Sequence, residues 1–185
     1  MADTRQENYN KFLALPIVPY KIISHLLTND DYIWKLIFYN SADAWMDSKQ
    51  NLTSDQKAAL IYDGVKPIND CRIFMDTGAD DAWHVESTQL RISVTEAVPT
   101  NYVYGSLYIA FEIYTHYSIN TLSCYQPRNL TIAQRLMEVF NGCDVEGIGR
   151  VFFDARATNK ARLTLAYGAI PYKGLSIIMG VKSLG

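Results

Sequence analysis

The chain has 185 residues, enough for one domain with a hydrophobic core, and its 49% apolar and 19% charged residues are typical of a globular protein. A net charge of -2 and a pI near 5.9 argue against a dedicated nucleic-acid-binding protein, which normally presents a basic surface. No apolar run reaches the roughly 18 residues that a membrane helix needs, and the polar start MADTRQENYN does not resemble a signal peptide, so we expect a soluble protein made in a cytoplasm.

The N-terminal part of the chain predicts an arm followed by a helix. Residues 1 to 16 are mostly polar, and Pro16 and Pro19 stop any helix there, so we expect an N-terminal arm over 1–16 and a single domain over 17–185. From Tyr20 to Leu27 the apolar residues follow helical spacing, which predicts the first helix.

Two further helices carry recognisable start signals. The acidic cluster from Thr28 to Asp31 predicts the N-cap of a second helix, because cap residues and acidic side chains favour a helix N-terminus. The apolar face of this helix consists of Ile33, Trp34, Ile37 and Phe38. In LTSDQKAALIYDG, Thr53 and Gln56 form a capping box, and Gly64 stands where we expect the third helix to end.

The hydrophobic period then changes from 3.6 to 2. Leu90, Ile92 and Val94 alternate with polar residues, and after the turn VPTNYVYG a longer strand runs from Leu107 to Tyr114. Two such strands joined by a turn predict a long antiparallel β-hairpin. The returning strand has Leu107, Ile109, Phe111 and Ile113 on one face and Tyr108, Ala110, Glu112 and Tyr114 on the other.

The C-terminal part predicts one helix and several strands. Pro127 opens a helix over 129–141 with an apolar stripe, and Asn141-Gly142 closes it. The segments RVFF, RLTLAY and LSIIMGVKSL read as strands separated by glycine and proline turns. We therefore expect an α+β fold: N-terminal helices, a long antiparallel β-hairpin, one helix packed on the sheet, and C-terminal strands.

Thirteen tyrosines are an unusual number, whereas the cysteines are unremarkable. Cys71, Cys124 and Cys143 are odd in number and widely spaced, which favours buried thiols over a disulfide or metal site. Gly147-Ile148-Gly149 is too sparse for a phosphate-binding loop, and we expect no cofactor. Tyrosine is favoured on strands and at protein interfaces, because its ring is apolar and its tip polar.

The tripeptide Asp76-Thr77-Gly78 resembles the catalytic motif of retropepsin-like aspartic proteases, in which an apolar strand, here Ile73-Phe74-Met75, delivers the aspartate. The resemblance implies a homodimer in which Asp76 of each copy activates water, because the reaction needs two carboxylates that share one proton. This homodimeric protease is the alternative function that the sequence raises.

The sequence around the tripeptide argues against that alternative. A capped helix occupies 129–141 and the residues before Asp76 are mostly helical, whereas a retropepsin-like chain is nearly all β with a glycine-rich flap. Aspartate and glycine are ordinary turn residues, so we expect a loop between two strands and no catalysis.

His25 and His116 lie at no diagnostic spacing from an activated serine or cysteine. Asp76, Asp80, Asp81 and His84 favour a solvated acidic loop over a metal site.

The order of elements resembles the small neck proteins of tailed bacteriophages, the tail terminators and the related tail-to-head joining proteins. The resemblance is carried by QLRISVTEAV, GSLYIAFEIYTHY, RNLTIAQRLMEVFNG and GLSIIMGVKSL, about half of the chain. The helical segment before residue 50 and the long segment 150–173 depart from the simplest members, which leaves open which ring of the neck this chain would form.

This resemblance implies a structural virion protein without catalysis. The family forms rings of six or twelve copies between the portal vertex and the tail, assembled in the host cytoplasm, with portal or adaptor and tail proteins as neighbours. Genomic DNA would pass through the ring without sequence-specific binding. Five tyrosines near the hairpin are expected either to line the contact between subunits or to cover a second layer of the same fold. They are Tyr102, Tyr104, Tyr108, Tyr114 and Tyr117.

Overall fold

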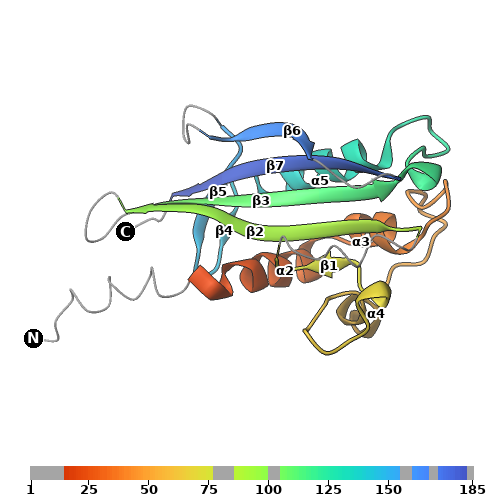
Figure 1. Cartoon of the computed structure of the whole chain (residues 1–185), viewed down its shortest axis with the longest axis horizontal. Helices are drawn as coiled ribbons and strands as arrows, with labels where there is room; N and C mark the ends of the chain where they lie inside the picture. The colour runs from red at the N-terminus through yellow and green to blue at the C-terminus, as the bar shows by residue number, and fades with distance from the viewer. Residues whose placement is uncertain (1–14, 77–85, 100–104, 155–159, 167–170, 183–185) are drawn as a thin grey trace, which may run out of the picture.

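The computed structural model describes residues 15–76, 86–99, 105–154, 160–166 and 171–182 (Figure 1). Within them the chain forms the predicted α+β fold, a seven-stranded mixed sheet in the order β1-β2-β3-β7-β5-β4, with β6 also paired to β7. The strands are β1 Ile73–Phe74, β2 Thr88–Pro99, β3 Gly105–His116, β4 Asp144–Val145, β5 Gly149–Phe152, β6 Arg162–Ala166 and β7 Tyr172–Lys182.

The hairpin predicted from alternating apolar residues is confirmed. β2 and β3 pair antiparallel from Thr88↔Thr115 to Pro99↔Gly105, and the register shifts between Val94 and Glu96, as at a β-bulge. The short strand β1 joins the outer edge of β2 in parallel. One face of the hairpin packs into the core, because its alternate side chains are apolar.

β7 lies in the middle of the sheet although it comes last among the strands. It pairs antiparallel with β3 along its whole length, from Ser106↔Lys182 to His116↔Tyr172. Its other edge is shared, because β5 pairs with residues 180–182 and β6 with residues 174–178. Figure 1 shows β2, β3 and β7 running side by side as the longest strands of the molecule.

The first helix begins earlier than the sequence predicts. A 3₁₀ turn, η1 (Leu15–Ile17), leads into α2 (Val18–Asn29), so Pro19 lies inside the first helical turn instead of stopping the helix. Proline is tolerated there because the first amides of a helix have no intrahelical acceptor. Of the predicted arm, residues 1–14 lie outside the described residues.

The predicted N-cap of the second helix is displaced by two residues. Thr28 and Asn29 belong to α2, where their side chains bond back to the carbonyls of Ser24 and His25. Asp30 follows α2, and its Oδ1 accepts a hydrogen bond of 2.6 Å from the Ile33 amide at the start of α3 (Tyr32–Phe38). Two aspartates, Asp30 and Asp31, therefore separate the two helices, and the side chain of the first caps α3.

The third helix has the predicted start but a different end. Thr53 and Gln56 form the capping box of α4 (Ser54–Ala59), whereas the helix stops before Leu60 and does not reach Gly64. The chain instead extends to pair with the start of β1: the Arg72 and Ile73 amides both donate to the Leu60 carbonyl, and Ile61 forms a bridge with Ile73. Pairing with this segment takes the place of the last helical turn. A short 3₁₀ turn, η2 (Ile68–Asp70), lies between the two paired segments.

The helix after the hairpin is confirmed as α5 (Arg128–Phe140), and the turn η4 (Tyr117–Ile119) connects β3 to it. Gly142, with a φ of +82°, follows its end, where a left-handed residue commonly stops a helix. At its start, Arg128 is fully buried and donates hydrogen bonds to the carbonyls of Leu36, Tyr39, Ser41 and Ile119. Burial lowers the pKa of this guanidinium to about 10.

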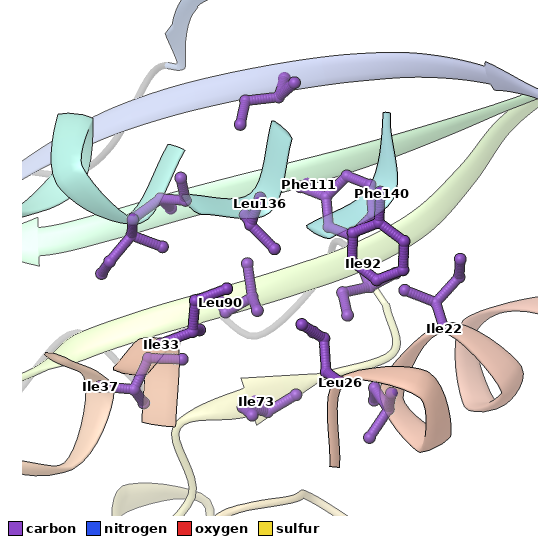
Figure 2. Close-up of a cluster of buried hydrophobic side chains, with 14 of the residues drawn as sticks. Ile22, Leu26, Ile33, Ile37, Ile73, Leu90, Ile92, Phe111, Leu136 and Phe140 are labelled. Carbon is purple, nitrogen blue, oxygen red and sulfur yellow. The ribbon is translucent and has the colours of Figure 1, made fainter. Parts of the chain in front are cut away.

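The core lies between one face of the sheet and the helices α2, α3 and α5. Figure 2 shows side chains from all of these elements meeting: Ile22 and Leu26, Ile33 and Ile37, Ile73, Leu90 and Ile92, Phe111, Leu136 and Phe140. The rings of Phe111 and Phe140 lie 5.2 Å apart, which fixes α5 against β3.

Candidate functional site

Asp76 lies at an edge of the sheet. Its side chain is exposed and directly follows the two-residue strand β1, while Thr77 and Gly78 lie outside the described residues. Asp80, Asp81 and His84, which the sequence considers as metal ligands, also lie outside them. Within the described ranges, no group of three or more histidine, cysteine, aspartate or glutamate side chains could hold a metal ion.

The five tyrosines proposed for the subunit contact lie in different environments. Tyr108 and Tyr114 are 8% and 5% exposed, so most of each ring is covered within one copy. Tyr117 is 62% exposed at the end of β3, and Tyr102 and Tyr104 lie outside the described residues. Of the three that the structure describes, Tyr117 alone is mostly exposed.

Tyr114 belongs to a buried polar cluster on the sheet face opposite the helices. The Arg91 guanidinium lies 4.9 Å from the centre of its ring and 5.9 Å from that of Phe74. The Tyr114 hydroxyl donates a 3.1 Å hydrogen bond to Glu112. Burial, followed by the charge of Glu112, raises the pKa of Tyr114 to about 12, so the phenol stays neutral and acts as a donor. This cluster holds β1, β2 and β3 together.

The structure brings His116 beside Ser118 and Glu86, an arrangement that the sequence analysis missed. His116 Nδ1 lies 2.6 Å from Ser118 Oγ and 3.6 Å from Glu86 Oε1, and Ser118 Oγ also contacts Glu86. A catalytic triad needs the imidazole between the other two groups, with one ring nitrogen for each. Here the serine lies between them, and its amide donates to His116 Nδ1, so the trio caps η4.

A second pair, His25 and Cys143, also comes from distant parts of the chain. His25 Nε2 lies 3.4 Å from Cys143 Sγ, and the ring of Phe140 packs beside the imidazole at 5.4 Å. Burial lowers the pKa of His25, which favours the neutral ring, and the Cys143 thiol also contacts the Asp144 carbonyl at 3.7 Å. A nucleophilic cysteine needs a thiolate beside a charged partner, so this pair is a packing contact.

The strand β6 forms an exposed edge of the sheet. Among the described residues it pairs only with β7, which leaves its outer main-chain groups without a strand partner. Leu163 and Leu165 stand opposite Ile177 and Leu175, on the side of the sheet that carries the core, and yet they are 40% and 83% exposed. An open, apolar edge of this kind is a template for pairing with another chain.

The loop before α5 holds a strained aromatic residue. Tyr125 has a φ of +62°, the left-handed region that glycine or asparagine normally occupies, and its side chain is 92% exposed. The left-handed conformation costs an ordinary residue about 1–2 kcal/mol. Two main-chain bonds enforce it, from the Tyr125 amide to Leu122 and from the Leu122 amide to Gln126.

Beside this loop lies a polar cleft of about 360 Å³. Its lining residues are Tyr32, Gln126, Thr131, Gln134, Arg135 and Glu138. Of these, Arg135 is bonded to Asp30 at 2.5 Å and to Glu138 at 2.9 Å. The pKa of Glu138 lies below its usual value because of its hydrogen bonds with Arg135 and Gln134, so a charge pair lines the cleft at neutral pH.

The sequence predicts β6 as a strand but does not predict its exposure. Alternation shows which side chains share a face, and it does not show whether a strand has partners on both edges. A turn that ends in a left-handed residue is usually signalled by glycine or asparagine, and LSCYQ contains neither, so nothing in the sequence indicates the strained loop. No described helix is long and apolar enough to cross a membrane.

Comparison with known proteins places the chain in a family. The model of a protein family described as YomW, a phage-type family, matches residues 30–177, far more than half of the chain. No curated protein matches significantly. The matched residues include α3, α4 and α5, the hairpin and most of β7.

Proposed function

Because the chain belongs to the YomW family of phage-type proteins, we propose that it is a structural virion protein that forms a closed ring at the connection between head and tail. It would act there as a tail terminator or head–tail adaptor and would carry out no catalysis. The expected assembly is a ring of six or twelve copies, made in the host cytoplasm and contacting portal or adaptor proteins on one side and tail proteins on the other.

The observation that supports assembly is the open edge of β6. Soluble proteins guard their sheet edges with charges, bulges or a covering segment, because an exposed edge recruits other strands. Among the residues that the structure describes, no strand pairs with the outer main-chain groups of β6, which also carries two exposed leucines and Arg162 as its one charged residue. In a ring, this edge is covered by the neighbouring copy.

Charge favours a second copy as the occupant of this edge. Arg162 lies on the exposed strand and gives it a positive charge, whereas the ammonium of Lys160, just before the strand, is paired with Glu96. The chain as a whole carries a net charge of -2, so the remaining surface is acidic on balance. A copy that turns a different, acidic surface toward β6 makes a head-to-tail contact, and such contacts generate rings when the rotation closes.

The passage of DNA is compatible with this composition. The net charge of -2 provides little attraction for phosphate groups, and a ring that lets the genome slide past must avoid such attraction.

The proposal gives Asp76 no chemical role, so Asp76→Asn should assemble like the wild type. Pepstatin-sensitive cleavage of a peptide library that is lost in Asp76→Asn would instead identify a protease.

The test is the mass and shape of the purified protein. Light scattering and negative-stain electron microscopy should show rings whose mass is a multiple of 21.0 kDa. Leu165→Glu, which places a charge on the exposed edge, should release folded monomers. Val65→Glu provides the matched control, because Val65 is 90% exposed and lies far from β6 in the sequence. A wild-type protein that stays monomeric at every concentration would falsify the ring.

A further inference from the structure

We infer that Tyr125 is an anchor for a two-fold contact between copies of this chain, in which the tyrosine of each copy enters the polar cleft of the other. The inference rests on the proposed function for the existence of the ring, and it adds a second contact, between rings. The two contacts use separate surfaces: Figure 1 places the loop before α5 at the end of the long strands and β6 along one side of the molecule.

The first observation is that Tyr125 occupies a position for which its side chain is unsuited. A bulky residue with positive φ is a genuine outlier, and strain of this kind persists only where the surrounding structure enforces it. The loop is well supported: the Ser123 amide donates to the Ala42 carbonyl at 2.8 Å, and Trp45 Nε1 donates to Ser123 Oγ at 2.8 Å. Leu122, at the start of the turn, is 1% exposed. The loop therefore presents a rigid ring.

The second observation is that this ring is exposed and makes no specific contact with the described part of its own chain. Tyr125 is 92% exposed, and across the described residues it makes no side-chain hydrogen bond and no ring contact. A rigid, exposed tyrosine is the kind of residue that dominates protein interfaces, because it buries a large area with little loss of conformational entropy. The strain is then explained by a contact that forms only when two copies meet.

The third observation is the cleft beside it. Gln126, the residue after Tyr125, lines this cleft of about 360 Å³, which is large enough for a phenol ring. The Arg135 guanidinium is 41% exposed and can stack under an aromatic ring, while Glu138, 46% exposed, can accept a hydrogen bond from its hydroxyl. The cleft therefore offers both interactions that recognise a tyrosine side chain.

Because Tyr125 lies beside the cleft of its own copy, the contact between two copies has a defined symmetry. When both features lie on the same face, two copies can satisfy both at once only if a two-fold axis relates them, since each residue contact then occurs twice. A ring contact at β6 combined with a two-fold contact at Tyr125 gives two rings face to face. With six copies in each ring, this arrangement contains twelve.

The experiment compares the assembly mass of the wild type with that of Tyr125→Asn by sedimentation velocity or mass photometry. Asparagine tolerates the left-handed conformation and removes the ring, so the variant should have half the wild-type mass at equal concentration. Its thermal midpoint, measured in dilute solution where both proteins are dissociated, should rise by about 2–5 °C because the strain is relieved. Gln134→Trp, which adds a bulky ring to the lining of the cleft, should halve the mass in the same way.

A matched control is Tyr20→Asn, which removes another exposed tyrosine, 58% exposed, from a relaxed helical position. It should leave the mass unchanged. If the ring itself does not form, the wild type should be a dimer and Tyr125→Asn a monomer, and the two-fold contact survives. Equal masses for the wild type, Tyr125→Asn and Gln134→Trp overturn the inference whatever that mass is.

Discussion

At the scale of single residues, Arg128 organises the region between α3 and α5. Its guanidinium donates to carbonyls in α3, in the segment after α3 and in η4, so one side chain joins three parts of the main chain that are distant in sequence. Each of these carbonyls would otherwise need another donor, because an unpaired buried polar group is costly.

Arg128→Leu should therefore be among the most damaging single substitutions in this protein. We expect a loss of about 3–5 kcal/mol in the free energy of unfolding, because four carbonyls lose their donor together. Arg128→Lys should recover only part of this loss, since an ammonium cannot reproduce the planar fork of donors. Urea denaturation measures the difference, with Lys173→Leu at an exposed position as the control. Equal losses for Arg128→Leu and Lys173→Leu would contradict this role.

His25 predicts a pH dependence in the mildly acidic range. Burial lowers its pKa below the usual value of 6.5, so between these two pKa values the unfolded chain binds a proton that the folded protein does not. Stability should therefore fall as the pH drops below 6.5 and continue to fall until the folded pKa is passed. The Cys143 thiol and the Phe140 ring face this imidazole, and neither supplies a negative charge that would offset the effect.

His25→Gln isolates this contribution from that of the carboxylates. The free energy of unfolding should be compared at pH 7.5 and pH 5 for both proteins, and the decrease should be smaller in the variant. An identical decrease in the two proteins would show that the imidazole titrates in the folded state as it does in the unfolded chain.

At the scale of elements, the joint between β6 and β7 depends on one glycine. A Cβ at Gly174 would lie 2.5 Å from the Ala166 carbonyl oxygen and 2.8 Å from the Tyr114 ring, closer than any side chain tolerates. Both neighbours are held in place, the first by strand pairing and the second by the Arg91 cluster. The main chain of β6 can approach β7 here only because position 174 has no side chain.

Gly174→Ala should consequently push the end of β6 away from β7. We expect a loss of about 2–3 kcal/mol, as for other overpacked sites, and faster hydrogen exchange in residues 162–166 than in β2 or β3. Ser176→Ala, two residues along the same face of β7, is the control and should leave exchange in β6 nearly unchanged. Unchanged protection in Gly174→Ala would mean that the strands adjust without separating.

The elements that the sequence predicts well are those set by local periodicity. The hairpin follows from strict alternation, and α5 follows from an apolar stripe between a proline and a glycine. The end of α4 was wrong because Leu60 pairs with residues 72 and 73, and the stop at Pro19 was wrong because a first-turn proline loses no hydrogen bond. His25 and Cys143 are 118 positions apart, so no local pattern could bring them together.

At the scale of the whole molecule, an assembled protein should show a stability that depends on its concentration. If copies cover the β6 edge of their neighbours, association stabilises the folded state by mass action. The wild-type thermal midpoint should rise by several degrees across about a hundredfold range of concentration, whereas that of Leu165→Glu should stay constant. A constant midpoint for both proteins would show that no association is linked to folding in this range.

The pattern of exposure also limits what sequence could say about the candidate surfaces. Tyrosines of the hairpin were expected either to line a contact between subunits or to cover a second layer of the same fold, and the structure covers Tyr108 and Tyr114 within one copy. The ring of Tyr125, the most exposed tyrosine that the structure describes, follows no periodic pattern because it lies in a turn. Surface exposure is a property of the complete fold, and periodicity reports only which side chains share a face.

The position of β7 has a consequence for how the chain is made. Strands β3, β5 and β6 all use β7 as a partner, and all three leave the ribosome before it. Until Tyr172–Lys182 has been translated, the nascent polypeptide holds three unmatched strand edges, which nearby polypeptides of the same kind could capture. A premature stop codon anywhere before residue 172 should thus give insoluble fragments instead of a shortened folded protein.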